Sequence, residues 1–302
     1  IQICVGYGVW TAGAGFQLGC ERFGALAIPA GPGNIDMQIQ FIEDFETTVL
    51  CCTASMALLL AEEIERRGIR DRVRVKKVIF GAERSSDAMR ARIRDLIGAE
   101  HVFDIPGLTE VYGPGTGLDC VHHSGVHYWA DYYILEVLNP ETLEPVPEGE
   151  VGEMVYTTLR KEAAPLIRYR SRDLTRLVPG DCPCGSPLPR HDKIVGRSDD
   201  MFIVRGVNIY PSHIDEILSR EKGIGSEYQI HLSHQEDGKD YMVVRVEREP
   251  GGDPSRDGDL CRRIERDLRK ETLVSATVEI LDYQGLPRTE RKAKRVFDHR
   301  TF

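Results

Sequence analysis

The chain has 302 residues, 41% hydrophobic and 29% charged, so it can bury a sizeable core and is long enough for two domains. Its formal net charge of -9 argues against binding to nucleic acid or to an anionic membrane, because both need clustered Lys and Arg. No apolar run approaches the roughly 20 residues that cross a bilayer, and the first residues lack a signal-peptide pattern. We therefore expect a cytoplasmic protein whose partners are small molecules.

The first hundred residues alternate between short apolar runs and amphipathic stretches. We expect strands at 25–29, 48–50, 77–80 and 101–104, and helices at 35–45, 55–67 and 85–97. Thr53 is a candidate helix N-cap, and Gly68 and Gly98 are candidate helix ends. This alternation predicts an α/β fold with a mostly parallel sheet covered by helices on both faces.

The pattern then becomes β-rich, with strands expected at 133–138, 152–158 and 173–177. After residue 196 the expected order is strand 201–204, helix 212–220, strands 228–232 and 241–247, helix 260–272 and strand 276–281. That order predicts a smaller, ferredoxin-like α+β domain. We assign residues 1–198 to part of a large domain, with an α/β part to about 119 and a β-rich part from about 120, and residues 199–302 to the smaller domain.

Two segments of the large domain carry residues suited to a nucleotide. Thr109 and Glu110 follow a strand end and a glycine-containing loop; a hydroxyl can donate to a phosphate oxygen, and a carboxylate can hold Mg²⁺. Asp173 ends a basic, aromatic stretch and could accept both ribose hydroxyls. The alternatives are a loop cap for the Thr-Glu pair and a surface ion pair with Arg168 or Arg172 for Asp173.

Two further segments complete the pattern. Residues 196–211 contain Gly-Arg-Ser-Asp-Asp-Met followed by Val-Arg-Gly-Val-Asn, and residues 285–296 contain a run of Lys and Arg after Gly-Leu-Pro. Together with the first two segments, in this order, they resemble the adenylate-forming superfamily and its phenylacetate-CoA ligase branch. The resemblance covers essentially the whole chain.

The resemblance implies an acid:CoA ligase that uses ATP, Mg²⁺ and CoA. A carboxylic acid, expected to be aryl or arylacetic, would attack the α-phosphate of ATP, and the CoA thiol would then displace AMP from the acyl-adenylate. Alternatives are a relative that stops at the AMP adduct and a partial, non-catalytic nucleotide-binding protein. A homodimer is expected only because soluble enzymes are commonly dimers.

Site residues follow from the same resemblance. Glu110 would bind Mg²⁺ and Thr109 a phosphate, with Lys292 as the catalytic lysine and Lys294 as its rival. Asp199 would be the hinge. The remaining implied residues are Gly81, Ala82, Glu83, Asp104, Gly107, Asp173 and Arg197 for the nucleotide, Arg205 and Gly206 for CoA, and Tyr7, Gly8 and Pro114 for the acid pocket.

The sequence departs from the family pattern in three places. The Gly- and Ser/Thr-rich loop that grips the ATP phosphates in this superfamily is not in the chain, and we expect it upstream of Ile1. Pro106 stands where an aromatic residue is usual, which removes a stacking surface for adenine. Arg291 replaces the glycine before the catalytic lysine, which is why Lys294 remains an alternative.

A separate set of residues is suited to a metal. Cys120 and His127 have C-x₆-H spacing, and Cys182 and Cys184 supply a close second pair, so three thiols and one imidazole could form a tetrahedral Zn²⁺ site. His122 and His123 compete with His127 for the fourth position. Such a site would be structural, because four protein ligands leave no open position for a substrate. The alternative is a set of reduced loop thiols.

Overall fold

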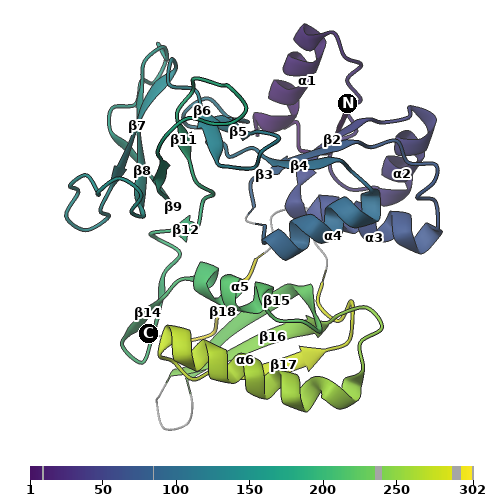
Figure 1. Cartoon of the computed structure of the whole chain (residues 1–302), viewed down its shortest axis with the longest axis vertical. Coiled ribbons are helices and arrows are strands. Elements are labelled where there is room, and N and C mark those ends of the chain that lie inside the picture. The colour runs from purple at the N-terminus through teal and green to yellow at the C-terminus, as the bar shows by residue number, and fades with distance from the viewer. Residues whose placement is uncertain (9, 84, 235–239, 288–293, 301–302) are drawn as a thin grey trace. The chain divides into compact units, whose positions relative to one another are not determined.

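The computed structural model describes residues 1–8, 10–83, 85–234, 240–287 and 294–300 (Figure 1). The chain divides into two compact units, with the main boundary between Ser198 and Asp199. Within the described residues, no helix is both long enough and apolar enough to cross a membrane. Each unit has its own hydrophobic core.

The first unit begins with a parallel four-stranded sheet in the order β1-β2-β3-β4. Its strands are β1 (Gln2–Ile3), β2 (Val49–Thr53), β3 (Lys77–Gly81) and β4 (His101–Asp104). The helices are α1 (Ala12–Phe23), α2 (Ile35–Asp44), α3 (Ala54–Arg67) and α4 (Asp87–Ile97). In Figure 1, α1 lies on one side of the sheet and α3 and α4 lie on the other. The predicted α/β fold is therefore confirmed.

Local sequence explains where α3 begins and ends. The Thr53 hydroxyl accepts a hydrogen bond from the backbone N–H of Met56 at 3.2 Å, which satisfies one of the free N–H groups of the first turn. Gly68 ends the helix with a φ of 63°, a left-handed conformation that glycine adopts without steric cost. Between them Leu58, Leu60 and Ile64 are buried.

The rest of the first unit consists of two antiparallel sheets, in the orders β10-β11-β6-β5 and β12-β9-β8-β7. A core of aromatic and aliphatic side chains that includes Tyr133, Met154 and Tyr156 lies in this region. The strands are β5 (Gly117–Asp119), β6 (Val126–Tyr128), β7 (Tyr133–Leu138), β8 (Gly152–Thr158), β9 (Tyr169–Thr175), β10 (Leu177–Val178), β11 (Arg190–His191) and β12 (Gly196–Arg197).

The second unit has a two-stranded hairpin and a mixed four-stranded sheet in the order β17-β16-β15-β18. The central strands are antiparallel, and each edge strand is parallel to its neighbour. Its elements are β13 (Phe202–Val204), β14 (Val207–Ile209), α5 (Pro211–Ser219), β15 (Ile224–His234), β16 (Asp240–Arg248), the 3₁₀ turn η1 (Pro254–Arg256), α6 (Asp257–Thr272), β17 (Thr277–Leu281) and β18 (Val296–Asp298).

Several elements differ from the sequence-based expectations. The strand expected at 201–204 pairs with β14 in the hairpin, and β18 is the fourth strand of the sheet instead. The strand expected at 25–29 is reduced to a single bridge between Ile28 and Gln2. Helix α1 was not predicted, because Gly13, Gly15 and Gly19 lower its helix propensity and obscure its periodicity.

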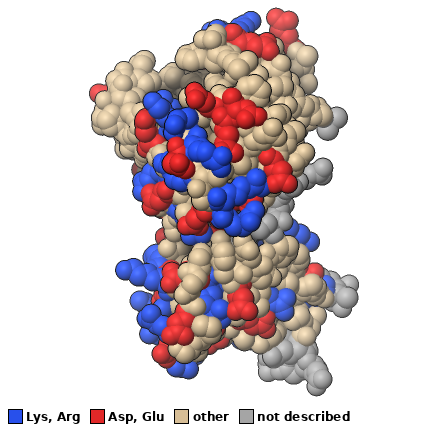
Figure 2. Space-filling view, turned by 90° about the vertical axis from the view of Figure 1, so that its right-hand side faces the viewer, with Lys and Arg blue, Asp and Glu red and all other residues tan. Residues whose placement is uncertain are grey.

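Charged side chains of both signs are interspersed on the face shown in Figure 2. In α3, Glu63 pairs with Arg66 at 2.6 Å and with Arg67 at 2.5 Å. These ion pairs hold the pKa of Glu63 at about 2, chiefly through the hydrogen bond from Arg66. Such mixed charge does not form the single-sign surface that a polyanion requires.

Replacing Leu60 of α3 by alanine should destabilise the first unit. Leu60 is fully buried (0% exposed), so Leu60→Ala removes buried methyl groups and leaves a cavity, at a cost of roughly 2–5 kcal/mol in the free energy of unfolding. Urea denaturation measures this loss. The matched control is Leu18→Ala in α1, where 62% exposure predicts a change within about 0.5 kcal/mol. Equal losses from both variants would contradict this core assignment.

Candidate nucleotide-binding site and metal-ligand cluster

The carboxyl ends of β3 and β4 meet at a very close backbone approach. A Cβ atom on Gly81 would lie 2.2 Å from the carbonyl oxygen of Ile105, so only glycine fits there. The backbone N–H of Ile105 also donates to the carbonyl of Phe80 at 3.0 Å. The loops that follow the two strands are thereby held next to each other, at the edge where open α/β sheets bind ligands.

A pocket opens at this edge. It brings together five of the predicted residues, which are Gly81, Ala82, Gly107, Thr109 and Pro114. Its other lining residues come from the first turns of the chain and from the sheet and its loops, and are Val5, Trp10, Ala12, Phe16, Cys52, Ile105 and Gly113. Tyr7 and Gly8 do not line it, and Tyr7 packs instead beside Gly13 and the small core of Ile3 and Val5.

Two predicted carboxylates are held from neighbouring helices. Asp104 accepts a 2.7 Å hydrogen bond from Arg90 of α4, and burial raises the pKa of Asp104 although that guanidinium opposes the shift. Glu83 accepts hydrogen bonds from the hydroxyl and backbone N–H of Ser55 at the start of α3. Both carboxylates are thus anchored by protein groups, and the sequence alone did not indicate Arg90 or Ser55.

Thr109 and Glu110 are exposed and lie within the loop between β4 and β5. The Glu110 carbonyl accepts a hydrogen bond from the Lys161 ammonium, which ties the loop to the segment after β8. Burial raises the pKa of the Tyr169 phenol, and the nearby Glu110 and Asp173 carboxylates raise it further while Arg197 lowers it. Tyr169 is therefore close enough to Glu110, Asp173 and Arg197, three predicted site residues, for their charges to shift its pKa.

Asp173 and Arg197 are cross-strand neighbours. They face each other in the pairing of β9 with β12, and Arg197 Nη1 lies 3.3 Å from Asp173 Oδ1. The alternative partners pair elsewhere: Arg168 with Glu136 at 3.2 Å and Arg172 with Glu153 at 3.7 Å. The sheet, rather than sequence proximity, determines the partner of Asp173.

Glu153 of β8 forms a buried network that the sequence did not reveal. Its carboxylate accepts hydrogen bonds from Arg170 Nε at 2.7 Å and Nη2 at 2.8 Å, and from the Ser198 hydroxyl at 2.8 Å. Burial alone would raise the pKa of Glu153, but these hydrogen bonds and the charges of Arg170 and Arg172 hold it below its usual range. The network therefore holds Ser198, the last residue before the boundary between the two units.

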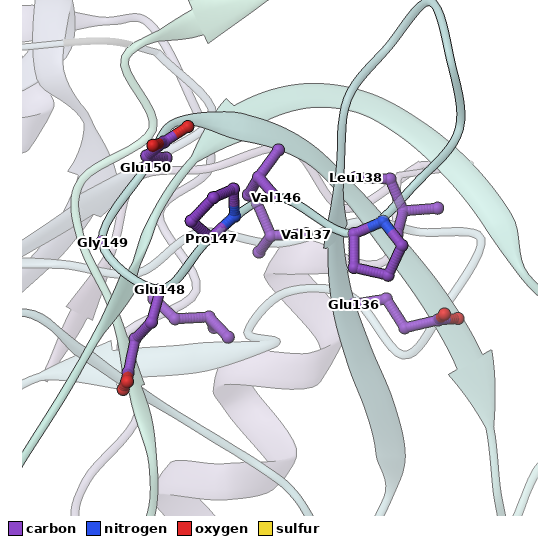
Figure 3. A pocket seen from close by; sticks show the side chains of 10 residues that line it. Glu136, Val137, Leu138, Val146, Pro147, Glu148, Gly149 and Glu150 are labelled. Carbon is purple, nitrogen blue, oxygen red and sulfur yellow. The ribbon is translucent and has the colours of Figure 1, made fainter.

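A second pocket lies elsewhere in the β-rich part, between β7 and the loop 145–150 (Figure 3). Its labelled side chains include Val146, Pro147 and the carboxylates of Glu136, Glu148 and Glu150. None of its ten lining residues is Lys or Arg, and none is a predicted site residue. Its acidic rim does not suit a phosphate-bearing ligand.

In the second unit, the predicted CoA-binding residues form the turn between β13 and β14. Arg205 and Gly206 have φ values of 52° and 78°, as in type I′ hairpin turns, and a Cβ on Gly206 would meet nothing within 4 Å. The backbone N–H of Arg205 donates to Asp240 Oδ2 at 2.9 Å. Lys294 places its ammonium 5.0 Å from the centre of the Phe297 ring, whereas Lys292 lies outside the described residues.

The structure also brings the four predicted metal ligands together. The donor atoms of Cys120, His127, Cys182 and Cys184 all lie within 4.8 Å of one another. A hydrogen bond from Ser124, with further help from neighbouring groups, lowers the pKa of Cys182 to about 5, which favours the thiolate form. His123 is turned away to Asp119, with Nδ1 at 2.5 Å from Oδ2, so it does not take the fourth position.

Comparison with known proteins assigns the chain to one family. Residues 9–158 match the AMP-binding enzyme family and residues 206–300 its C-terminal domain. The phenylacetate-coenzyme A ligases of Pseudomonas putida and Escherichia coli are 37% and 38% identical to the chain; each alignment covers 99% of the chain, and 68% and 69% of the relative. The chain belongs to the phenylacetate-CoA ligase family of AMP-binding enzymes.

Solved structures give the same relationship. A crystal structure of 2-hydroxyisobutyryl-CoA ligase in the postadenylation state, in complex with R3-HIB-AMP, is 29% identical with a TM-score of 0.85. The match covers 98% of this chain and 65% of that protein, so the chain spans just under two thirds of its structural relative. A further structure of that ligase contains both 2-HIB-AMP and CoA.

The Glu153 network makes the stability of the first unit depend on pH. Because the pKa of Glu153 is depressed in the folded state, its contribution is present above the ordinary value of 4.5 and is lost as the pH falls through the lower folded-state value. Glu153→Gln should cost roughly 2–4 kcal/mol at pH 7, since it leaves Arg170 and Arg172 without the charge. Urea denaturation of wild type and variant should show this difference shrinking towards pH 3.

The exposed Glu150→Gln provides the control for this measurement and should change the free energy of unfolding by less than about 0.5 kcal/mol. A Glu153→Gln difference that stayed constant between pH 7 and pH 3 would mean that the carboxylate charge is not what stabilises the network.

Proposed function

We propose that this chain is the nucleotide-handling part of an ATP-dependent acid:CoA ligase. The enzyme would convert a carboxylic acid to its acyl-adenylate with release of pyrophosphate, and then transfer the acyl group to the sulfur of CoA with release of AMP. The observation that carries this proposal is the pocket beyond β3 and β4, where Gly81, Ala82, Gly107 and Thr109 meet in a chain that belongs to the phenylacetate-CoA ligase family.

The roles of the individual residues are part of the proposal. Thr109, exposed at the pocket, is suited to donate its hydroxyl hydrogen to a phosphate oxygen. Asp173 is suited to accept from ribose hydroxyls, with Arg197 keeping the carboxylate oriented through their 3.3 Å contact. Gly81 and Ala82 line the pocket with little or no side chain, which leaves room for adenine or the acid to lie against the backbone.

Glu110 is the proposed Mg²⁺ ligand. Glu110 is exposed and directly follows Thr109, and hard carboxylate oxygens are the donors that Mg²⁺ prefers. The ion, when bound, would neutralise charge on the phosphates of ATP. A structural Zn²⁺ at the cysteine and histidine cluster is proposed as a component that takes no part in this chemistry.

The second unit is proposed to supply the remaining groups, with residues 1–198 and 199–302 acting as two domains and Asp199 as the hinge. Arg205 and Gly206 form an uncrowded turn that would allow pantetheine to pass close to the backbone. A lysine from the motif around residue 292 would offset the negative charge where the acid carboxylate meets the α-phosphate.

The acid is proposed to be aryl or arylacetic. The lining of the pocket supports this choice, because Trp10, Phe16 and Pro114 present apolar surfaces to a flat ring. The names of the phenylacetate-coenzyme A ligases point the same way. The 2-hydroxyisobutyryl-CoA ligase is named for an aliphatic acid, so an acid panel must contain both kinds.

Pyrophosphate release by the full-length protein tests the proposed reaction. With ATP, Mg²⁺ and a panel of aryl, arylacetic and short aliphatic acids, we expect acid-dependent pyrophosphate release, fastest with a phenylacetate-like acid. AMP release should require CoA, because the acyl-adenylate otherwise stays bound. Pyrophosphate without CoA-dependent AMP release would indicate an enzyme that stops at the adenylate. No pyrophosphate with any acid would contradict the proposal.

The identity of the catalytic lysine is tested by paired substitutions in the full-length protein. Lys292→Ala should lower the rate of adenylation by about 10²–10³-fold, because it removes the positive charge that brings two anions together. Lys294→Ala should have a much smaller effect, since its ammonium lies over the Phe297 ring. Single-turnover pyrophosphate release measures both, with Lys222→Ala as an exposed lysine control. A large loss only with Lys294→Ala would transfer the role to that residue.

A further inference from the structure

We propose that the first unit binds one structural zinc ion, which joins the β5–β6 hairpin to the loop between β10 and β11. Its ligands would be one imidazole and three thiolates, from His127, Cys120, Cys182 and Cys184. The site lies apart from the proposed nucleotide pocket, as none of these residues lines that pocket.

The distances match tetrahedral zinc coordination. Zn–S bonds of about 2.3 Å and Zn–N bonds of about 2.0–2.1 Å place two sulfurs about 3.8 Å apart, and a sulfur and a nitrogen about 3.6 Å apart. The sulfurs of Cys120 and Cys182 are 3.7 Å apart, and the Cys184 sulfur is 3.3 Å from His127 Nε2. These two pairs therefore have close to the spacing that a single ion would give them, and all four donors lie within 4.8 Å of one another.

The histidine is oriented as a metal ligand. Nδ1 of His127 lies 3.0 Å from the carbonyl oxygen of Leu188, and because a carbonyl can only accept, Nδ1 must carry the proton. The lone pair is then on Nε2, which faces the sulfur of Cys184. A backbone carbonyl that fixes the tautomer and ring orientation is the usual support of a zinc-binding histidine.

Arg190 and Ser124, which lie beside the cluster, can compensate the negative charge of the cysteine thiolates. Arg190 is buried at 6% exposure, and its Nη1 donates to the Ser124 hydroxyl oxygen at 2.8 Å. Because Ser124 accepts there, its own proton can point to the Cys182 sulfur, 3.3 Å away. Arg190 also donates to the backbone carbonyls of Ser124, Pro179, Gly180 and Asp181, which are uncharged acceptors. Three thiolates, one imidazole and Zn²⁺ sum to -1, which this buried guanidinium offsets.

Hydrogen bonds within the β10–β11 loop position Cys182 and Cys184. Gly185 turns back with a φ of 79°, and its N–H donates to the Cys182 carbonyl at 3.0 Å. The N–H of Ser186 points to the Cys184 sulfur at 3.5 Å. Arg190 also donates to the carbonyl of Gly180 at 3.0 Å. Four protein ligands leave no position for a substrate, so the zinc stabilises the β-rich part and does not act on a substrate.

The direct test is the metal content of the purified protein after exhaustive dialysis against metal-free buffer, measured by elemental analysis. We expect about one zinc per chain. Replacement by Co²⁺ should produce the intense visible absorption of a tetrahedral site, together with thiolate-to-cobalt charge-transfer bands. A strong chelator should remove the metal and lower the Tm by at least about 5 °C, because the ion binds only the folded state.

Substitutions identify the ligands. Cys184→Ser should lower the zinc content at least tenfold; since Cys184 is exposed, this variant need not disturb the core. His122→Asn, an exposed neighbour in the same loop, and Cys261→Ser, a cysteine of the second unit, are the matched controls and should retain one zinc per chain. Both the metal analysis and the cobalt spectrum of the unsubstituted protein remain decisive if a ligand variant does not fold.

Three results would overturn the proposal. These are a zinc content below about 0.1 per chain in protein purified without chelators, stoichiometric iron in place of zinc, and a disulfide between Cys120 and Cys182 found by mass spectrometry of freshly isolated protein. None of these readouts depends on ligase activity, so the zinc proposal can fail while the proposed function stands, and the reverse.

Discussion

The contact between Gly81 and the Ile105 carbonyl is the constraint on which the proposed nucleotide site depends. A Cβ atom at residue 81 would lie only 2.2 Å from the carbonyl oxygen, so this position accepts no side chain. Because Gly81 has none, the ends of β3 and β4 can lie close together, and the loops that follow them line one pocket. Because β3 and β4 are parallel, the loops that follow them leave the sheet at the same edge. The absence of a side chain on Gly81 allows the two loops to approach each other there. Everything proposed for Ala82, Gly107 and Thr109 follows from this approach.

Two different devices organise the β-rich part of the first unit. The Glu153 network uses buried charge and hydrogen bonds to hold β8, β9 and Ser198 together. The cysteine and histidine cluster lies on the other sheet, where strands of two or three residues give little backbone pairing. The zinc ion proposed above would crosslink these short strands to the loop at residues 179–189, because metal binding and folding are coupled.

The sequence predicted most of the parallel sheet and its helices because caps, glycine stops and apolar periodicity are local signals. Thr53 and Gly68 act as their residue types predicted. The sequence could not show that Asp173 pairs with Arg197, that Arg90 binds Asp104, or that Tyr169 lies near these site residues. Strand pairing and helix packing bring these residues together from distant positions in the chain. The sequence could not show that Tyr7 packs against a small core, because an aromatic residue beside glycines fits a core as well as a pocket wall.

The hydrogen bond from Ser198 to Glu153 also bears on the hinge proposed at Asp199, because it holds the residue just before that hinge. Asp173 and Arg197 sit on strands paired with each other, and Ser198 is bound immediately after them by its hydroxyl. A rotation that starts at Asp199, as proposed, would leave the pairing of Asp173 with Arg197 undisturbed. Under the proposed function, Asp173 would then keep the same position relative to the first unit in both half-reactions.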